Sequence, residues 1–568
     1  MKIINLCKKY LLQHKLQLLL YIFITLAGTA ISILSPYIIG DFLDNLIEGG
    51  NAGVILRFSV IFGSISVLSI VKNYIASVMR VKMSTQMSYD LNIDTVRHIQ
   101  SLSLTYIDNK DGAYLNQRVH GDAGSLIGFC IGVLQNMVTN VILIIVPFVL
   151  LLSMNWFISL LLTGFLVLYA GLYVLFKKPL YNASLAFMES QNKFFAGLFE
   201  QLKYIKFIKI NANQFEMNKR ATDGFFCMKK TRVHHQKVNY VYSGLFGFIS
   251  TIAQIILFIV GGLQILNGNF TIGMFTIFTS YFNMMLASSR YFFGLGAYYQ
   301  QTLVAYRRIK EIFENQPEKC GNKAIRTVSK IELRDVCFSY SVREADSLNK
   351  NNYELCLESD FHAETDCALF VPKEAINNIT MTFNNNKIYA IVGANGAGKS
   401  TIINLMIGLY IDEYSGTILY DNLDIRQIDM EAARRNLIGF AEQEQLLVKD
   451  SIRYNLDLGD ESEDFGYIRD CIKVLNMENF ISQNTFDYEI NEKNTNASGG
   501  EKQKISILKV LAKNPVVMIF DEPTSAIDAQ TTKRFIEHLQ EIKTDKIIII
   551  ITHEKLVIEQ CDEVVVVV

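Results

Sequence analysis

Six long apolar stretches occupy most of the chain up to about residue 305. Each is close to the ~20 residues that a helix needs to cross the hydrocarbon core of a membrane. Long polar segments and short links separate them, so the pattern predicts six transmembrane helices, some continuing into long polar extensions. The expected spans are 18–40, 54–76, 126–153, 157–177, 241–266 and 272–300.

Lysine and arginine are distributed unevenly between the two ends of these spans. The short links 41–53, 154–156 and 267–271 contain neither residue, whereas the long segments 77–125 and 178–238 and both flanks are rich in them. By the positive-inside rule, the N-terminus and both long segments face the cytosol. The first apolar stretch is too long for the core of a signal peptide, and we interpret it as a retained span.

Each long polar segment has the pattern of a helix that runs on from one span, turns and returns to the next. In the first, a polar turn at 108–112 divides residues 101–118. In the second, residues 198–220 combine apolar positions at helical spacing with several lysines. The simple interpretation is two solvated hairpins. The alternative, favoured by the resemblance given below, is a short docking helix at each tip that contacts an ATPase domain.

Two charged residues, Lys72 and Arg290, stand out within the expected spans. A charge inside a membrane is costly unless it faces water or reaches the interface. Lys72 lies near the cytosolic end of its span and is expected to extend to the interface. Arg290 lies deeper, among aromatic residues that favour helix packing, and a substrate role for it is the less favoured alternative. These aromatic residues are Phe275, Phe278, Tyr281, Phe282, Tyr291, Phe292 and Phe293.

The chain changes character near residue 331, where short strands and helices replace the long apolar stretches. We therefore expect an α-helical transmembrane domain over 1–316, a linker over 317–330 and an α/β domain over 331–568. A polar, acidic stretch at about 341–375 lacks periodicity and interrupts the second domain. We interpret it as a surface insertion, because strand signals return only at residue 376.

The most specific motif is a glycine-rich turn between an apolar strand and a helix, Gly393-x4-Gly398-Lys399-Ser400. Its glycines allow consecutive backbone N–H groups to surround a phosphate, so the α/β domain is predicted to be a P-loop NTPase that binds ATP. Lys399 would reach the β and γ oxygens, and Ser400 would face Mg²⁺. The expected nucleotide-binding residues of this loop are Gly393, Asn395, Gly396, Gly398, Lys399, Ser400 and Thr401.

A second apolar strand, 516–520, ends in two consecutive carboxylates. Asp521 would hold Mg²⁺, partly through water, and Glu522 would orient or deprotonate the attacking water. A strand ending in Asp-Glu is a weak signal alone. It becomes a strong one downstream of a phosphate loop in the same domain.

The run from Ala497 to Gln503 resembles the signature of the ATP-binding cassette (ABC) transporters, which is usually LSGGQ. The N-terminus of a helix would be formed by Ser498, Gly499 and Gly500. Its hydroxyl and backbone N–H groups would then face a bound anion. The resemblance implies that this anion is the γ-phosphate bound to the opposite subunit. Glu501 stands in place of the usual glutamine, and its side chain either turns towards the phosphate or points to solvent.

Other positions of the sequence resemble further motifs of the same family. The resemblance implies that Tyr340 stacks on adenine, that Gln443 senses Mg²⁺ and that His553 contacts the γ-phosphate. Residues 525–528 resemble a segment that contacts the other subunit, and 487–496 resemble one that touches the docking helices. The implied catalytic residues are Glu522 and His553, and the implied metal ligands are Ser400, Gln443 and Asp521.

The order of six spans, two long cytosolic segments and one ATPase domain resembles a bacterial ABC exporter half-transporter over nearly the whole chain. This implies a dimer, formed with a second copy of the chain or with another half-transporter, that works with ATP and Mg²⁺ in the cell membrane. Two features depart from the family: the insertion, and an end at Val568 where the family normally continues.

Charge and composition narrow the choice of partners. With 54 basic and 55 acidic residues, the chain lacks the basic signature of a nucleic-acid binder. Besides membrane lipid, the expected partner is a transported substrate: a small peptide, a lipid or a hydrophobic drug would each suit an aromatic cavity. We favour a secreted peptide, and an ATP-gated channel or regulator is a further alternative that Glu522 and His553 argue against.

Overall fold

The computed structural model describes residues 2–108, 115–116, 118–343, 370–443, 447–456, 465–490 and 498–567. The chain forms two compact units, one of residues 1–97 and 115–314, the other of residues 98–114 and 315–568. Long helices build the first unit, and both β-sheets lie in the second. The segment expected as a linker, 317–330, therefore belongs to the second unit.

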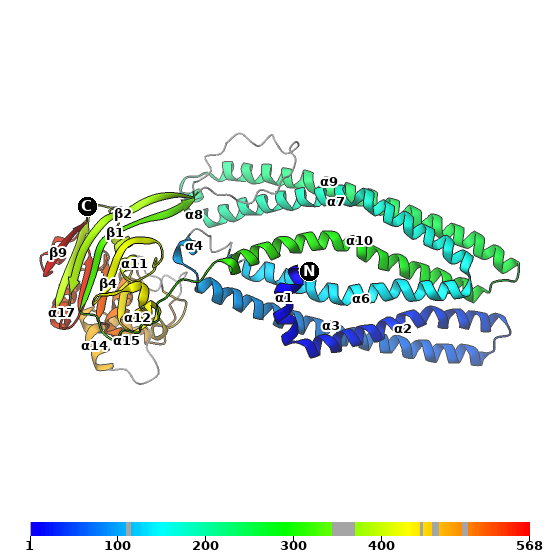
Figure 1. Ribbon diagram of the computed structural model, residues 1–568, viewed down its shortest axis with the longest axis horizontal. Helices are drawn as coiled ribbons and strands as arrows, with labels where there is room; N and C mark the ends of the chain where they lie inside the picture. The colour runs from blue at the N-terminus through cyan, green and yellow to red at the C-terminus, as the bar shows by residue number, and fades with distance from the viewer. Residues whose placement is uncertain are drawn as a thin grey trace. The chain divides into compact units, whose positions relative to one another are not determined.

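Long helices that run side by side make up the first unit (Figure 1). A short helix, α1 (Lys2–Gln13), precedes them, a π-helical turn, η1 (Arg118–Asp122), leads into α6, and α8 (Ile205–Ile210) lies between α7 and α9. The long helices are α2 (Lys15–Ile47), α3 (Ala52–Gln100), α6 (Ala123–Met154), α7 (Trp156–Lys203), α9 (Gln214–Leu266) and α10 (Ile272–Glu314).

Among the described residues, five helices are long and apolar enough to cross a membrane: α2, α3, η1 with α6, α7 and α9. They contain the first five expected spans. The sixth expected span, 272–300, lies within α10, which has 43 residues but is not one of the five. The sixth crossing therefore stays a prediction.

The start of α10 is fixed by an acidic residue near the end of α2. Asp44 accepts hydrogen bonds from the backbone N–H of Gly273 and the hydroxyl of Thr271, both at 2.7 Å. A carboxylate at a helix N-terminus satisfies unpaired N–H groups and interacts favourably with the helix dipole. The short link between α9 and α10 is thereby anchored to α2.

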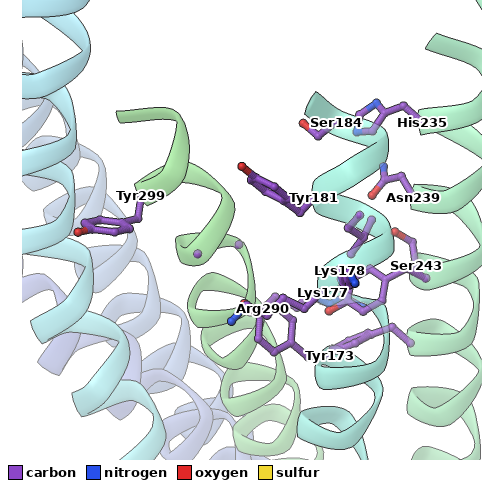
Figure 2. Close-up of a pocket in the computed structure, with 15 residues that line it drawn as sticks. Tyr173, Lys177, Lys178, Tyr181, Ser184, His235, Asn239, Ser243, Arg290 and Tyr299 are labelled. Atoms are coloured by element: carbon purple, nitrogen blue, oxygen red, sulfur yellow. The ribbon is translucent and has the colours of Figure 1, made fainter. Parts of the chain in front are cut away.

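Most of the aromatic stripe on α10 packs against neighbouring helices, as the sequence favoured. Phe278, Tyr281 and Phe282 are buried, and the Tyr281 hydroxyl donates to the carbonyl of Ile33 at 2.7 Å. Arg290 lies instead on the wall of a cavity of about 890 Å³ formed by α7, α9 and α10 (Figure 2).

Short helices form in both long polar segments, near the expected tips. The first, α4 (Leu104–Asp108), belongs to the second unit, where Leu104 packs against the hydrophobic core. Asp108 accepts a hydrogen bond from the Tyr410 hydroxyl at 3.1 Å, and Thr105 donates to the Glu413 carboxylate. The first docking contact is thus formed within this chain. The second short helix is α8, whose docking stays a prediction.

The second unit contains two sheets. One is antiparallel, with strand order β2-β1-β4-β5, and the other is parallel, with strand order β6-β7-β8-β3-β9. The antiparallel strands are β1 (Lys330–Arg343), β2 (Phe370–Asn384), β4 (Tyr414–Tyr420) and β5 (Leu423–Asp424). The parallel strands are β3 (Lys387–Gly393), β6 (Ile438–Ala441), β7 (Val517–Asp521), β8 (Ile547–Ile551) and β9 (Glu563–Val567).

The remaining helices of the second unit are short. They are α11 (Lys399–Met406), η2 (Ile425–Gln427), α12 (Met430–Asn436), α13 (Ile452–Asn455), α14 (Phe465–Val474), α15 (Glu478–Asn484), α16 (Gly499–Lys513), α17 (Ala529–Ile542) and α18 (Lys555–Ile558).

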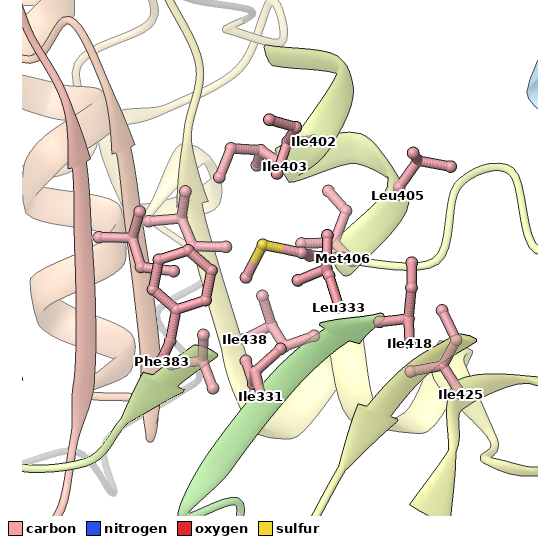
Figure 3. Packing of buried hydrophobic residues seen from close by; sticks show 14 of the residues in the cluster. Ile331, Leu333, Phe383, Ile402, Ile403, Leu405, Met406, Ile418, Ile425 and Ile438 are labelled. Carbon is pink, nitrogen blue, oxygen red and sulfur yellow. The ribbon is translucent and has the colours of Figure 1, made fainter. Parts of the chain in front are cut away.

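The central strands β7 and β8 of the parallel sheet are buried on both faces, which explains their continuous apolar sequences. Alternate residues of β8 enter different clusters: Ile547 and Ile549 join one, and Ile548 and Ile550 join the other. The first cluster also receives Ile402 and other residues of α11 (Figure 3). Because α11 begins at the phosphate loop, this packing fixes the position of that loop.

The edges of the expected insertion at 341–375 need correction. Strand β1 continues to Arg343, and β2 already begins at Phe370, not at residue 376. Once the register is set by the apolar pairs nearer the core, backbone hydrogen bonds extend the ladder without further burial. Residues 344–369, the rest of the insertion, lie outside the described residues.

We predict that replacing residues 344–369 with a four-residue Gly/Ser turn leaves the ATPase domain folded. Arg343 and Phe370 are paired across the ladder, so a short turn can join them. Thermal unfolding and ATP hydrolysis of the purified full-length variant check this. A domain that no longer unfolds cooperatively would contradict the prediction.

Candidate nucleotide site

The phosphate loop joins β3 to α11 in a conformation that requires glycine. Gly396 and Gly398 have φ of +86° and +88°, in the left-handed region that glycine adopts without steric cost. A Cβ at Gly398 would also lie only 2.6 Å from the carbonyl oxygen of Ala375. The first N–H groups of α11 have no partner within the helix, so they provide donors at its positive end.

Lys399 and Ser400 already take part in polar contacts around this loop. The Lys399 ammonium donates to the carbonyls of Gly393 at 2.7 Å and Ala394 at 3.0 Å, and the residue is only 9% exposed. The Ser400 hydroxyl donates to Asp521 at 2.8 Å. A cation, a hydroxyl and free helix N–H groups therefore surround one position, which fits the phosphates of a nucleotide.

Asp521 is buried at the end of β7, and its environment suits a cation. Burial raises the pKa of its carboxyl group, Glu522 adds to this, and the Ser400 hydrogen bond and the Lys399 charge oppose it. A divalent cation beside Asp521 would favour the ionised form. Asp521 and Ser400 together therefore fit a Mg²⁺ site, which the sequence predicted from them.

Glu522 lies directly after β7, between two other predicted site residues. Its carboxylate accepts a hydrogen bond from the Gln443 amide at 2.8 Å and lies 3.8 Å from Nε2 of His553. Gln443 follows β6 and His553 follows β8. The three residues therefore lie at the carboxyl ends of three adjacent parallel strands. Glu522 has φ of +48°, a conformation that is strained for a residue with a side chain.

Tyr340 lies on the other side of the phosphate loop. Its hydroxyl is 2.9 Å from the hydroxyl of Thr401, so it contacts the first turn of α11. Its ring packs edge-on against Tyr410, with ring centres 5.8 Å apart. Burial, with smaller contributions from Tyr340 and Asp108, raises the pKa of Tyr410. Tyr410 therefore connects the expected adenine-stacking residue to docking helix α4.

We predict that Tyr410→Phe lowers the coupling between nucleotide binding and the membrane domain. Phenylalanine keeps the ring contact with Tyr340 but removes the hydrogen bond to Asp108, which is worth about 1 kcal/mol. Nucleotide affinity should stay within about twofold, whereas the change in ATPase rate on reconstitution into lipid should shrink. Tyr454→Phe, at an exposed tyrosine of α13, serves as the control. Equal behaviour of the two variants would contradict the prediction.

The signature residues form the N-terminus of α16, and Glu501 adopts neither orientation that the sequence left open. Its carboxylate accepts from the backbone N–H of Ser498 at 2.6 Å, and the Ser498 hydroxyl accepts from the N–H of Glu501 at 3.3 Å. This is a capping box, in which both groups satisfy the helix end. The Glu501 carboxylate thus binds one N–H donor of the signature and places a negative charge beside the signature.

We predict that Glu501→Gln lowers the apparent KM for ATP several-fold. Glutamine keeps a carbonyl oxygen for the Ser498 N–H but removes a charge that repels an incoming phosphate. Steady-state hydrolysis at increasing ATP concentration measures the effect. Glu478→Gln, in the first turn of α15, is the matched control, and an unchanged KM in Glu501→Gln would refute the interpretation.

Gln503 is a buried polar residue beside the candidate site to which the sequence analysis gave no role. It is 3% exposed, donates to the carbonyl of Glu522 at 2.7 Å and to the Ser525 hydroxyl at 3.0 Å, and accepts from the N–H of Ala526 at 2.9 Å. It therefore joins the signature helix to the catalytic strand end and to segment 525–528. An amide on the otherwise apolar buried face of an amphipathic helix was the available signal.

The structure does not bring every predicted residue to one place. Among the described residues, no hydrogen bond joins Ser498, Gly499 or Gly500 to the phosphate loop, whereas the phosphate loop, Asp521, Glu522, Gln443 and His553 are linked side by side. The segment resembling the docking-helix contact, 487–496, is described only to residue 490, and Ala497 also lies outside the described residues.

Comparison with known families decides the classification. Residues 18–289 match the family model of the ABC transporter transmembrane region, and residues 376–525 match the model described as ABC transporter. The chain belongs to the ABC transporter family. It combines a helical transmembrane domain with an ATP-hydrolysing domain in one membrane protein of the exporter type.

Individual relatives agree with this architecture. A bacterial Atm1-family ABC exporter solved with ATP bound has the same fold, with a TM-score of 0.79 at 18% identity over 98% of this chain and 94% of that chain. The lactococcin-G-processing and transport ATP-binding protein LagD of Lactococcus lactis is 23% identical over 96% of this chain and 73% of its own length. ABC transporter B family member 1 of Dictyostelium discoideum is 27% identical over 83% of this chain, which spans half of that relative.

Proposed function

We propose that this ABC transporter exports a substrate across the cell membrane as a dimer, driven by ATP hydrolysis. The observation that carries the proposal is the position of Glu522, held between Gln443 and His553 beside the Ser400–Asp521 pair. A gate that only bound ATP would have no need for a general base beside the phosphate loop. The N-terminus and the ATPase domain lie in the cytosol in this proposal.

The residues divide the chemistry between them. Bound ATP would supply the phosphoanhydride bond whose cleavage drives the cycle, and Mg²⁺ would neutralise the charge of its phosphates. Lys399 and the loop N–H groups would hold the phosphates, and Ser400, Asp521 and Gln443 would hold the cation. Glu522 would take a proton from the attacking water, and His553 would stabilise the charge that develops on the terminal phosphate.

The separation between signature and phosphate loop supports a site shared by two chains. Ser498, Gly499 and Gly500 would contact the terminal phosphate held by the other copy, so nucleotide binding draws the two ATPase domains together and opens the outer side of the membrane domain. A closed twofold dimer of identical chains is the commonest oligomer, and we favour it over a pair of different half-transporters.

A small secreted peptide is the substrate that we favour. LagD, which resembles this chain over most of its length, is named for the processing and transport of lactococcin G. Export of a lipid or a hydrophobic drug is the alternative, because a cavity of the membrane domain is lined by tyrosines that would suit either.

Reconstitution into sealed liposomes tests the proposed function. We expect steady-state ATP hydrolysis, with no ATP-dependent leak of small ions. ATP-gated ion flux without hydrolysis would contradict the proposed export function and indicate a channel.

A further inference from the structure

The cavity of the membrane domain has a marked excess of positive charge. It measures about 890 Å³, within the range of small-molecule sites, and α7, α9 and α10 form its walls. Lys177 and Lys178 project from α7 and Arg290 from α10, and His235 contributes a titratable ring from α9 (Figure 2). Among the described lining residues there is no carboxylate to balance these charges.

The cations are not neutralised elsewhere in the described part of the chain. No described Asp or Glu forms an ion pair with Lys177, Lys178 or Arg290. Arg290 is instead held by an aromatic face, with its guanidinium carbon 4.2 Å from the ring centre of the buried Phe246. This contact fixes the guanidinium and leaves its N–H groups available at the cavity wall.

The rest of the wall suits an apolar or aromatic body. Tyr173, Tyr181, Tyr242 and Tyr299 line the cavity, and its surface is more apolar than polar. Two glycines of α10 keep it open: a Cβ at Gly294 would meet no other atom within 4 Å. Lys177 and Lys178 are exposed at the cytosolic end of their expected span, whereas Arg290 lies within one. A charge at that depth is costly unless it faces water or a counter-charge, so the position of Arg290 points to an anionic ligand.

We propose that this cavity binds an apolar or aromatic molecule carrying an oxyanion group, a carboxylate or a phosphate, and that Arg290 is the residue that recognises this group. The inference rests on the proposed export function and specifies its substrate class. A free peptide carboxylate and a lipid phosphate share this chemistry, and both would place the anion between α7 and α10 and the apolar part against the tyrosines.

Equilibrium binding of matched fluorescent probes tests the proposal. The full chain is reconstituted in phosphatidylcholine nanodiscs without nucleotide and titrated with dansylglycine, which carries a carboxylate, or dansylglycinamide, which does not. We expect dansylglycine to bind about tenfold more tightly than the amide, and Arg290→Gln to abolish that preference. Arg290→Lys should retain most of it, because the charge is kept.

Two further variants separate charge from shape and from folding. Gly294→Leu fills the cavity without a clash in the chain, so it should weaken both probes alike. Lys237→Gln removes an exposed cation of α9 that does not line the cavity, and both affinities should stay within about twofold. Equal binding of the two probes to the wild type, or equal loss in Lys237→Gln and Arg290→Gln, would overturn the proposal.

Lipid composition identifies the source of the oxyanion. Phosphatidylglycerol also repels an anionic probe through its surface charge, so its effect is compared between the wild type and Arg290→Gln. If it weakens dansylglycine binding about tenfold in the wild type and clearly less in Arg290→Gln, the proposal stands with a lipid phosphate as the occupant. If binding is unchanged, it stands with a free carboxylate. ATP hydrolysis is measured separately on the same samples. Loss of hydrolysis with intact probe selectivity would count against the export function and leave the anion site in place.

Discussion

Glu522→Gln should lower the steady-state rate of ATP hydrolysis by at least about 100-fold while leaving ATP binding within about twofold of the wild type. Glutamine has the same shape and can keep a hydrogen bond with Gln443, but it cannot accept the proton of the attacking water. Phosphate release by the reconstituted protein, with ATP affinity from calorimetry, gives both quantities.

The control for this variant is Glu537→Gln. Glu537 is an exposed residue of α17 in the same domain, so the same chemical change there should leave the rate unaltered. If the rate of ATP hydrolysis by Glu522→Gln stays within about twofold of the wild type, Glu522 is not the general base.

Lys399→Ala should act at an earlier step and weaken nucleotide binding by roughly 10-fold or more, since a charged hydrogen bond is worth about 1.5–3 kcal/mol. Its ammonium now donates to two loop carbonyls, which shows that it can reach the position where the phosphates would lie. Calorimetric titration of the full chain with ATP measures the loss.

A matched variant distinguishes this loss from a general effect of charge. Lys533→Ala removes an exposed ammonium of α17, and ATP affinity should not change. Because Lys399 also fixes the loop, thermal unfolding without nucleotide is followed in both variants. Unchanged ATP affinity in a folded Lys399→Ala protein would contradict the assignment of the phosphate loop.

Much of the architecture could be predicted because the relevant signals are local. The apolar length of each span, the glycine spacing before Lys399 and the apolar strand before Asp521 depend on neighbouring residues, and the described helices and strands fall where these signals lie. The strands were easy to recognise because burial on both faces requires continuous apolar runs such as 547–551.

Contacts between distant residues could not be predicted in the same way. The pair Thr105 and Glu413 is separated by 308 positions, and no local pattern marks either residue. The orientation of Glu501 is different, because the Ser498-x-x-Glu501 spacing of a capping box is a local signal that was present in the sequence and was not used. The charge of the cavity appears only when two helices, α7 and α10, bring Lys177, Lys178 and Arg290 together.

The central claim is that each catalytic site is built from two copies of this chain, and complementation between two inactive variants tests it most directly. Lys399→Ala disables the phosphate loop, and Gly499→Asp places a carboxylate at the signature, where an added Cβ meets nothing within 4 Å of its own chain. Each variant alone should be inactive, whereas the wild-type chain alone should hydrolyse ATP.

Co-assembled and reconstituted together, the two variants should recover roughly a quarter of the wild-type rate, because half of randomly formed dimers are mixed and each mixed dimer keeps one intact site. Lys399→Ala mixed with Glu522→Gln is the control, since both changes lie on the phosphate-loop side and no intact site can form. Recovery in the first mixture and not in the second is the result we predict. No recovery in the first mixture, with mixed dimers present, would contradict the shared site.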